Sequence, residues 1–155
     1  MFWWKKNKKQ SGTLAPGVTE EPTDGCTLKV IVKTDLGNVR KNNEDAGTFV
    51  KVSDEAVIRQ KGYLLLVADG MGGHNAGEVA SKIAMDTISE EYFKKDSNPN
   101  KEKALANAFF TANKKIYELA QLNESYKGMG TTCTVLIVAG QHLYFAHAGD
   151  RRAYI

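Results

Sequence analysis

Cysteine is scarce in this sequence, and no apolar run is long. The only two cysteines, Cys26 and Cys133, belong to no CxxC motif and no Cys/His cluster, so neither a disulfide framework nor a zinc site is indicated. No apolar stretch approaches the ~18 residues of a membrane span, and no hydrophobic segment follows the first lysines as in a secretory signal. These absences favour a cytoplasmic protein with reduced thiols.

An excess of basic charge is also missing from most of the chain. The formal net charge is +3, and Lys5, Lys6, Lys8 and Lys9 alone contribute four positive charges. The remainder is close to neutral, so we expect no nucleic-acid surface. With 155 residues, 42% hydrophobic and 25% charged, the composition is that of one globular domain.

The first 25 residues differ from the rest in composition. The opening MFWWKKNKKQ combines aromatic and basic residues, which would suit either contact with an anionic membrane surface or a disordered tail. Residues 10–25 are rich in Gly, Pro, Thr, Ser and acidic residues without periodicity. We therefore predict a tail and linker over 1–25 and a domain over 26–155.

The pattern of the domain predicts strands, two adjacent helices and then strands again. Alternation or continuous apolar character predicts strands, and apolar spacings of three and four predict helices. The expected strands are 28–34, 47–52, 63–68, 131–139, 142–148 and 153–155, the expected helices are 77–95 and about 105–120, and 53–62 is expected to be a loop. This order favours an α+β fold with helices on a sheet face and an antiparallel meander at the end.

Several carboxylates stand at the ends of these expected strands. Glu44 and Asp45 precede the second strand, Asp69 and Gly70 follow the third, and Asp150 follows the fifth. Carboxylates without His or Cys partners are hard oxygen ligands that suit Mg²⁺ or Mn²⁺. The alternative is that each Asp caps a turn, where this residue is common.

Four motifs in register distinguish these alternatives. They are TDLGNVRKNNED, VADGMGGHNAGEVAS, GMGTTCTVLIV and AHAGDRRAYI. Together they resemble, in order and spacing, four consecutive signatures of the metal-dependent Ser/Thr protein phosphatases (PPM or type 2C) in their bacterial form. The resemblance implies a four-layer αββα fold, an antiparallel β-sandwich flanked by helices with a metal centre at one end. It also implies hydrolysis of phosphoserine and phosphothreonine in phosphorylated proteins, opposite to a Ser/Thr kinase.

The resemblance also assigns roles by position. Asp69 would bridge two Mn²⁺ or Mg²⁺ ions, the carbonyl of Gly70 would bind one of them, and Glu44 and Asp45 would serve near the second. Asp150 would serve a third, weaker metal position. Two such cations lower the pKa of a bridging water, which supplies the nucleophile.

Other residues receive smaller roles. Arg40 matches the arginine that holds the substrate phosphate, for which its fixed fork of donors is suited. The family's acid-position histidine aligns with Met71, so we expect His74 to be a loop residue, and structural roles for His142 and His147. The GMGTT stretch lacks the GK[ST] of a nucleotide P-loop and is expected to be a turn that leads into a strand.

Two departures from the family pattern limit these expectations. Arg151 stands where the family usually has serine, next to the third metal position. The resemblance covers only the amino-terminal portion of the family's catalytic domain, so we expect an incomplete sandwich. We expect the intact enzyme to be a monomer, and the 155-residue chain alone to be inactive and poorly soluble. The alternative function is a non-catalytic binding or regulatory module with a phosphatase-like fold.

Overall fold

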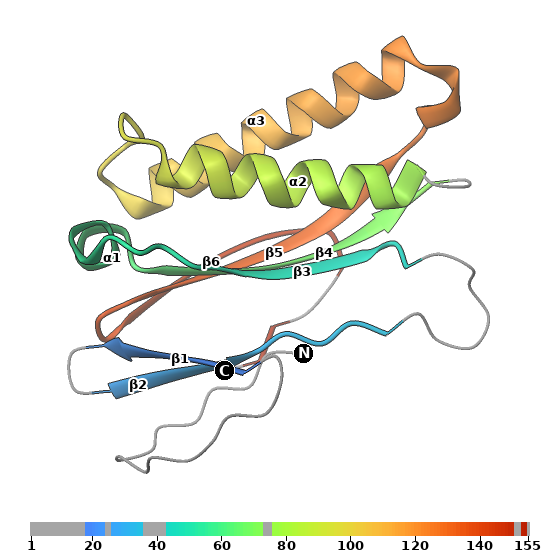
Figure 1. Cartoon of the computed structure of the whole chain (residues 1–155). Coiled ribbons are helices and arrows are strands. Elements are labelled where there is room, and N and C mark those ends of the chain that lie inside the picture. The colour runs from blue at the N-terminus through green and yellow to red at the C-terminus, as the bar shows by residue number, and fades with distance from the viewer. Residues whose placement is uncertain (1–17, 24–25, 36–42, 73–75, 151–152, 155) are drawn as a thin grey trace.

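The chain folds into three layers, as seen in a computed structural model that describes residues 18–23, 26–35, 43–72, 76–150 and 153–154. Two long helices form the upper layer, a four-stranded sheet the middle layer and a two-stranded sheet the lower layer (Figure 1). The predicted α+β class with helices on an antiparallel sheet is confirmed. Within the described residues no second helix layer covers the lower sheet.

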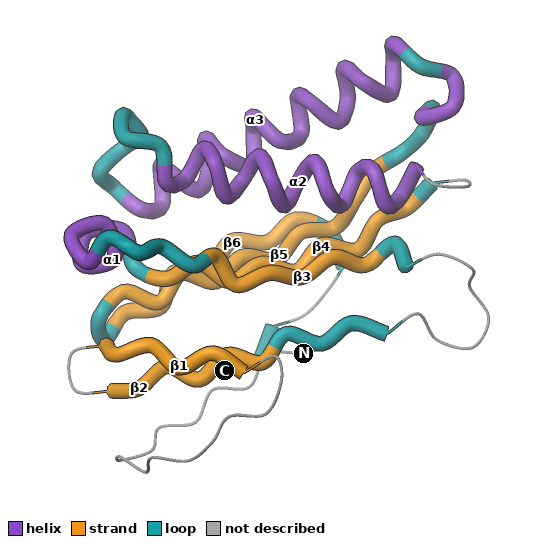
Figure 2. Tube along the Cα trace, in the orientation of Figure 1, coloured by secondary structure: helices purple, strands orange, loops and turns teal. Residues whose placement is uncertain are grey.

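The middle sheet has the strand order β3-β4-β5-β6 and is antiparallel throughout (Figure 2). Its strands are β3 (Asp45–Val50), β4 (Tyr63–Met71), β5 (Gly130–Ala139) and β6 (His142–Ala148). Strand β4 is covered on both faces, which is why its residues from Tyr63 to Leu66 are all buried and read as one apolar run. Strands β5 and β6 form the first two strands of the predicted meander.

The helices α2 (Ala76–Phe93) and α3 (Lys101–Leu122) pack on one face of this sheet. Their buried stripes repeat at the helical period and confirm the two predicted helices. The stripes consist mainly of Ala80, Ala84, Ile88 and Tyr92 on α2 and of Leu105, Ala108, Ala112 and Ile116 on α3. Asn100 caps α3 by accepting a 2.9 Å hydrogen bond from the Lys103 N–H, so the predicted break between the helices is also confirmed.

The lower layer is a hairpin of β1 (Val18–Thr23) and β2 (Cys26–Ile31). Leu28 and Val30 of β2 form a core cluster with Tyr63, Leu65 and Val138 of the middle sheet. Residues 18–23 lie in the predicted linker but pair as β1 with β2, although their polar sequence VTEEPT carries no strand alternation. The domain boundary at residue 26 stays a prediction.

Three local predictions need correction. Residues Glu55–Lys61 form a short helix, α1, inside the segment expected to be a loop, because Asp54 caps its first turn with a 2.8 Å bond from the Ala56 N–H. Asp69 and Gly70 lie within β4 and not after it. Ala153 and Tyr154 belong to no strand, although one was expected over 153–155.

No helix in the described ranges is long and apolar enough to cross a membrane.

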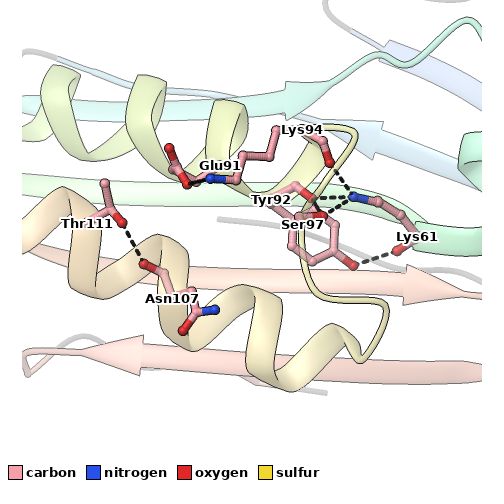
Figure 3. A network of polar contacts seen from close by, with 7 residues as sticks. All are labelled: Lys61, Glu91, Tyr92, Lys94, Ser97, Asn107 and Thr111. Carbon is pink, nitrogen blue, oxygen red and sulfur yellow. Dashed lines mark hydrogen bonds and ion pairs between the residues drawn. The ribbon is translucent and has the colours of Figure 1, made fainter.

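A buried lysine joins α1 to the end of α2 (Figure 3). The Lys61 ammonium donates to the carbonyl oxygens of Tyr92 at 2.9 Å and Lys94 at 3.0 Å and to the Ser97 hydroxyl. In return the Tyr92 hydroxyl donates to the Lys61 carbonyl at 2.7 Å. Burial lowers the pKa of Lys61, an effect that Asp96 partly offsets. The ammonium thus satisfies carbonyls that the end of α2 leaves without helical partners.

Candidate active site

Acidic and hydroxyl side chains form a row across three strands at one end of the middle sheet. Asp45 of β3 is the register partner of Asp69 of β4, and Thr132 of β5 is the partner of Asp69 on its other side. Directly opposite residues of an antiparallel pair project to the same face. The row therefore places two carboxylates and a hydroxyl on the face that turns toward the lower layer.

A cavity of about 410 Å³ opens at this end of the sheet. Its lining consists of Glu44, Asp69, Gly70, Met71, Gly72, Thr132 and Asp150. Its three carboxylates come from separate segments, which are the residue before β3, the end of β4 and the turn after β6. Four of the five predicted metal-binding residues thus meet in one cavity, and Asp45 lies outside its lining but opposite Asp69.

The glycines of the DGMGG motif allow close backbone contact with the start of α2. A Cβ atom on Gly70 would lie 1.9 Å from the Gly77 carbonyl oxygen, so the strand end and the first turn of α2 touch through backbone. The Gly70 N–H also donates to the Glu44 carbonyl at 3.0 Å. A Cβ on Gly77 would lie 3.1 Å from the Glu44 carboxyl carbon. These contacts place Glu44 between the end of β4 and the beginning of α2.

The donor set has the chemistry of a hard-cation site. It offers carboxylate, carbonyl and hydroxyl oxygens, the ligands that Mg²⁺ and Mn²⁺ prefer. The Thr132 hydroxyl is buried and has no hydrogen-bond partner in the part of the chain that the structure describes, as expected of a group that faces water or a ligand. Among those same residues, however, no three His, Cys, Asp or Glu side chains are close enough to hold one ion together.

The remaining predicted residues differ in how the structure places them. Arg40, His74 and Arg151 lie outside the described residues. Met71 lines the cavity and is 59% exposed, and its side chain has no acidic proton. The GMGTT stretch leads into β5 as expected, with Gly128 at φ 75°. Sequence reasoning missed Thr132, because its relation to Asp69 depends on strand register.

Cys133 is excluded as a thiol nucleophile at this site. Cys133 follows Thr132 but points to the opposite, helix-covered face, where it belongs to the main core cluster. Its side chain is 4% exposed, and burial raises the pKa of its thiol to about 12. A protonated, buried thiol neither attacks substrate nor binds metal.

Solved structures with the same architecture define the class of protein. The chain is similar to the Mycobacterium tuberculosis serine/threonine phosphatase PstP/Ppp, with 35% identity, a TM-score of 0.59 and coverage of 76% of this chain and 45% of that one. It is similar to a PstP catalytic domain in complex with two manganese ions, at 34% identity, a TM-score of 0.61 and coverage of 76% and 46%. The fold is that of part of a serine/threonine protein phosphatase.

The family follows from the sequence itself. The family model described as Protein phosphatase 2C matches residues 31–155, and the chain belongs to that family. It is 34% identical over 127 residues to the protein phosphatase PhpP of Streptococcus pneumoniae, covering 81% of this chain and 49% of that protein. It is 34% identical over 126 residues to the serine/threonine phosphatase stp of Listeria monocytogenes, covering 79% and 48%. The chain spans about half the length of these curated relatives, and the resemblance carried by the four motifs is confirmed.

Proposed function

We propose that this chain contributes the acidic half of a catalytic site that hydrolyses phosphoserine and phosphothreonine in proteins, with Mn²⁺ or Mg²⁺ as the cofactor. The observation that carries this proposal is the meeting of Glu44, Asp69 and Asp150 in one cavity with the backbone of Gly70. Carboxylates that line one cavity are stabilised by a cation that offsets their charge. Two manganese ions in the similar PstP structure support the number of cations.

Each acidic residue has a proposed place around the cations. A pair of cations would be held by Asp69, the Gly70 carbonyl, Glu44 and Asp45. Asp150 would serve a third, weaker cation position. When bound, such cations lower the pKa of water and offset charge on a phosphoryl oxygen. The chain itself supplies the rigid support, because strand pairing fixes Asp45 against Asp69 and the Gly70–Glu44 bond fixes the loop before β3.

The substrate side of the site rests on Arg40. Its guanidinium would orient the phosphate oxygens through paired hydrogen bonds, which a lysine cannot reproduce. The substrates are phosphoproteins produced by a Ser/Thr kinase, and the intact enzyme is a cytoplasmic monomer in this proposal. Because the chain spans about half of its relatives, we further propose that 155 residues alone are inactive.

The test is a gain of activity when the missing half is supplied. The chain is joined to the half of the Streptococcus pneumoniae phosphatase that it does not match, and hydrolysis of a phosphothreonine peptide and of p-nitrophenyl phosphate is measured with and without millimolar Mn²⁺. We expect Mn²⁺-dependent turnover by the chimera and none by the 155-residue chain. Asp69→Asn should abolish turnover, whereas Asp86→Asn on the exposed surface of α2 should not.

Two outcomes would contradict the proposal. Full activity of the Asp69→Asn chimera would remove Asp69 from the site. An inactive chimera that binds the phosphopeptide would favour the binding-module alternative. Arg40→Ala should raise KM or lower kcat/KM while Mn²⁺ affinity stays the same, so a loss of Mn²⁺ binding in that variant would give Arg40 a structural role.

A further inference from the structure

His147 is bonded at both ring nitrogens, and one of these bonds reaches the turn that carries Asp150. Its Nε2 lies 2.7 Å from the Gly149 carbonyl oxygen, and its Nδ1 lies 2.9 Å from the Thr134 hydroxyl on the neighbouring strand. Thr134 and His147 are register partners in the β5–β6 pair. The imidazole therefore joins two strands to the Gly149–Asp150 turn.

These partners define the protonation of the ring. A carbonyl oxygen only accepts, so Nε2 must carry the proton that is donated to Gly149. In the neutral ring, Nδ1 then accepts from the Thr134 hydroxyl, which can rotate to donate. The Phe145 ring stacks on the imidazole with centroids 6.1 Å apart and planes 13° apart. The ring is thus held in one orientation by two hydrogen bonds and a stacking contact.

The same turn also contacts Thr132, which lines the cavity. Gly149 has φ 114°, a conformation that favours glycine, and a Cβ there would lie 2.7 Å from Thr132 Cβ. Thr132 is the register partner of Asp69. Asp150 and Thr132 both line the cavity, so the position of this turn sets the place of Asp150 relative to Asp69.

We propose that His147 is a positioning residue that, with Thr134, holds the Gly149–Asp150 turn so that the Asp150 carboxylate faces the cavity. His147 transfers no proton to substrate, because both of its ring nitrogens are hydrogen-bonded within the protein and the residue does not line the cavity. The consequence for metal binding rests on the proposed function, in which Asp150 is a ligand. The inference about the position of the turn does not depend on the proposed function.

The first experiment needs no metal. Nitrogen NMR of ¹⁵N-histidine-labelled 155-residue chain, or of the chimera if higher solubility is required, should show His147 with its proton on Nε2. The amide resonances of Gly149 and Asp150 should shift in His147→Phe, which keeps the ring and its stacking but loses both hydrogen bonds. His142→Phe is the matched control, since His142 lies on the same strand without a bond to the turn. It should leave those two amides in place.

The second experiment measures Mn²⁺ affinity by titration. His147→Phe should weaken binding at the weakest site by about 10-fold, the usual effect of losing an outer-shell partner. Asp150→Asn should have a similar effect, and the double variant should be no weaker than Asp150→Asn alone. Thr134→Val should act in the same direction by a smaller factor, and His147→Gln, which retains a donor and an acceptor, should recover part of the loss.

The outcomes separate this inference from the proposed function. A proton on Nδ1, unchanged Gly149 and Asp150 amides in His147→Phe, or fully additive losses in the double variant would overturn the role of His147. Thermal melts of each variant identify a general loss of folding, in which case His147→Gln and Thr134→Val decide. If Asp69→Asn and Asp150→Asn leave Mn²⁺ binding unchanged while the amides shift as expected, the proposed function fails and the positioning role stands.

Discussion

Asp45 and Asp69 are directly opposite each other in the antiparallel β3–β4 pair, so their carboxylates leave the sheet on the same side. Opposed residues of such a pair have Cα atoms about 4.5–5.5 Å apart. Like charges at this distance destabilise a sheet, whereas a divalent cation between or beside them would reverse the effect. We therefore expect the stability of the sheet to depend on the presence of a cation.

This relationship predicts different effects of substitution in two conditions. In EDTA, Asp45→Asn should raise the free energy of unfolding by about 0.5 kcal/mol, because one of two opposed charges is removed. In millimolar Mn²⁺, the wild-type chain should gain thermal stability and Asp69→Asn should not. Urea denaturation and thermal melts measure both, with Asp86→Asn as the control. Destabilisation by Asp45→Asn in EDTA would show that this carboxylate supports the fold by itself.

The backbone contact between Gly70 and Gly77 predicts that a single methyl group at Gly70 is poorly tolerated. Gly70→Ala would place its Cβ 1.9 Å from a carbonyl oxygen, so β4 and α2 must separate, and we expect a loss of about 3 kcal/mol. Gly128→Ala is the matched control, because Gly128 has φ 75° but open space around it, and its strain should cost about 1 kcal/mol. Chemical denaturation compares the two. Equal losses would mean that α2 moves freely away from β4.

The lysine network predicts a large effect from a residue far from the cavity. Lys61→Met keeps the length of the side chain but removes the three hydrogen bonds that the ammonium donates to the Tyr92 and Lys94 carbonyls and to the Ser97 hydroxyl, so the free energy of unfolding should fall by about 2 kcal/mol. Lys127→Met removes a lysine whose ion pair with Glu124 is solvent-exposed and should change stability little. Urea denaturation of both variants at neutral pH tests this prediction. An unchanged stability of Lys61→Met would mean that water replaces the ammonium at these carbonyls.

The sequence predicts the long elements of this fold because their patterns are local. The apolar stripes of α2 and α3 repeat over several turns, and the run that begins at Tyr63 is apolar because helices cover one face of β4 and β2 covers part of the other. Helix α1 was missed because its seven residues are too few to show a stripe. Its last residue is held by the Tyr92 carbonyl, 31 positions along the chain. No local pattern contains such a contact.

The same distinction applies to the site. Carboxylates next to predicted strands suggested a shared site, and the structure brings Glu44, Asp69 and Asp150 to one cavity. The place of Thr132 depends on which residue of β5 faces Asp69, and the contact of His147 with Gly149 depends on the geometry of a turn. Register and turn geometry are fixed by the packing of the whole sheet, so they could not be predicted from spacing.

The buried thiol of Cys133 predicts a loss of stability in alkaline solution. Its pKa rises from 9.0 to about 12 in the folded chain, so between these values the unfolded chain releases a proton that the native chain retains. The contribution of Cys133 is therefore complete below pH 9.0 and is lost progressively as the pH approaches 12. Denaturation of wild type and Cys133→Ala under reducing conditions, from pH 8 to 10.5, should show their difference in stability shrinking. A constant difference would mean that the native thiol ionises as easily as the unfolded one.

Strand β6 predicts how the 155-residue chain behaves at high concentration. It is an edge of the middle sheet, and its Leu143 and Phe145 are 42% and 49% exposed, whereas β2 packs on the same sheet around Tyr63 and Leu65. An exposed apolar edge strand pairs readily with other chains, so we expect the isolated chain to associate as its concentration rises. Phe145→Lys should shift sedimentation velocity profiles toward the monomer, since a charged residue on an edge strand opposes pairing. Phe110→Lys, on α3 and 72% exposed in the wild type, removes as large a ring without altering the edge and should have a smaller effect. If both substitutions shift the chain equally toward the monomer, association is due to exposed aromatic surface in general. If the wild-type chain stays monomeric, the β6 edge is protected in solution.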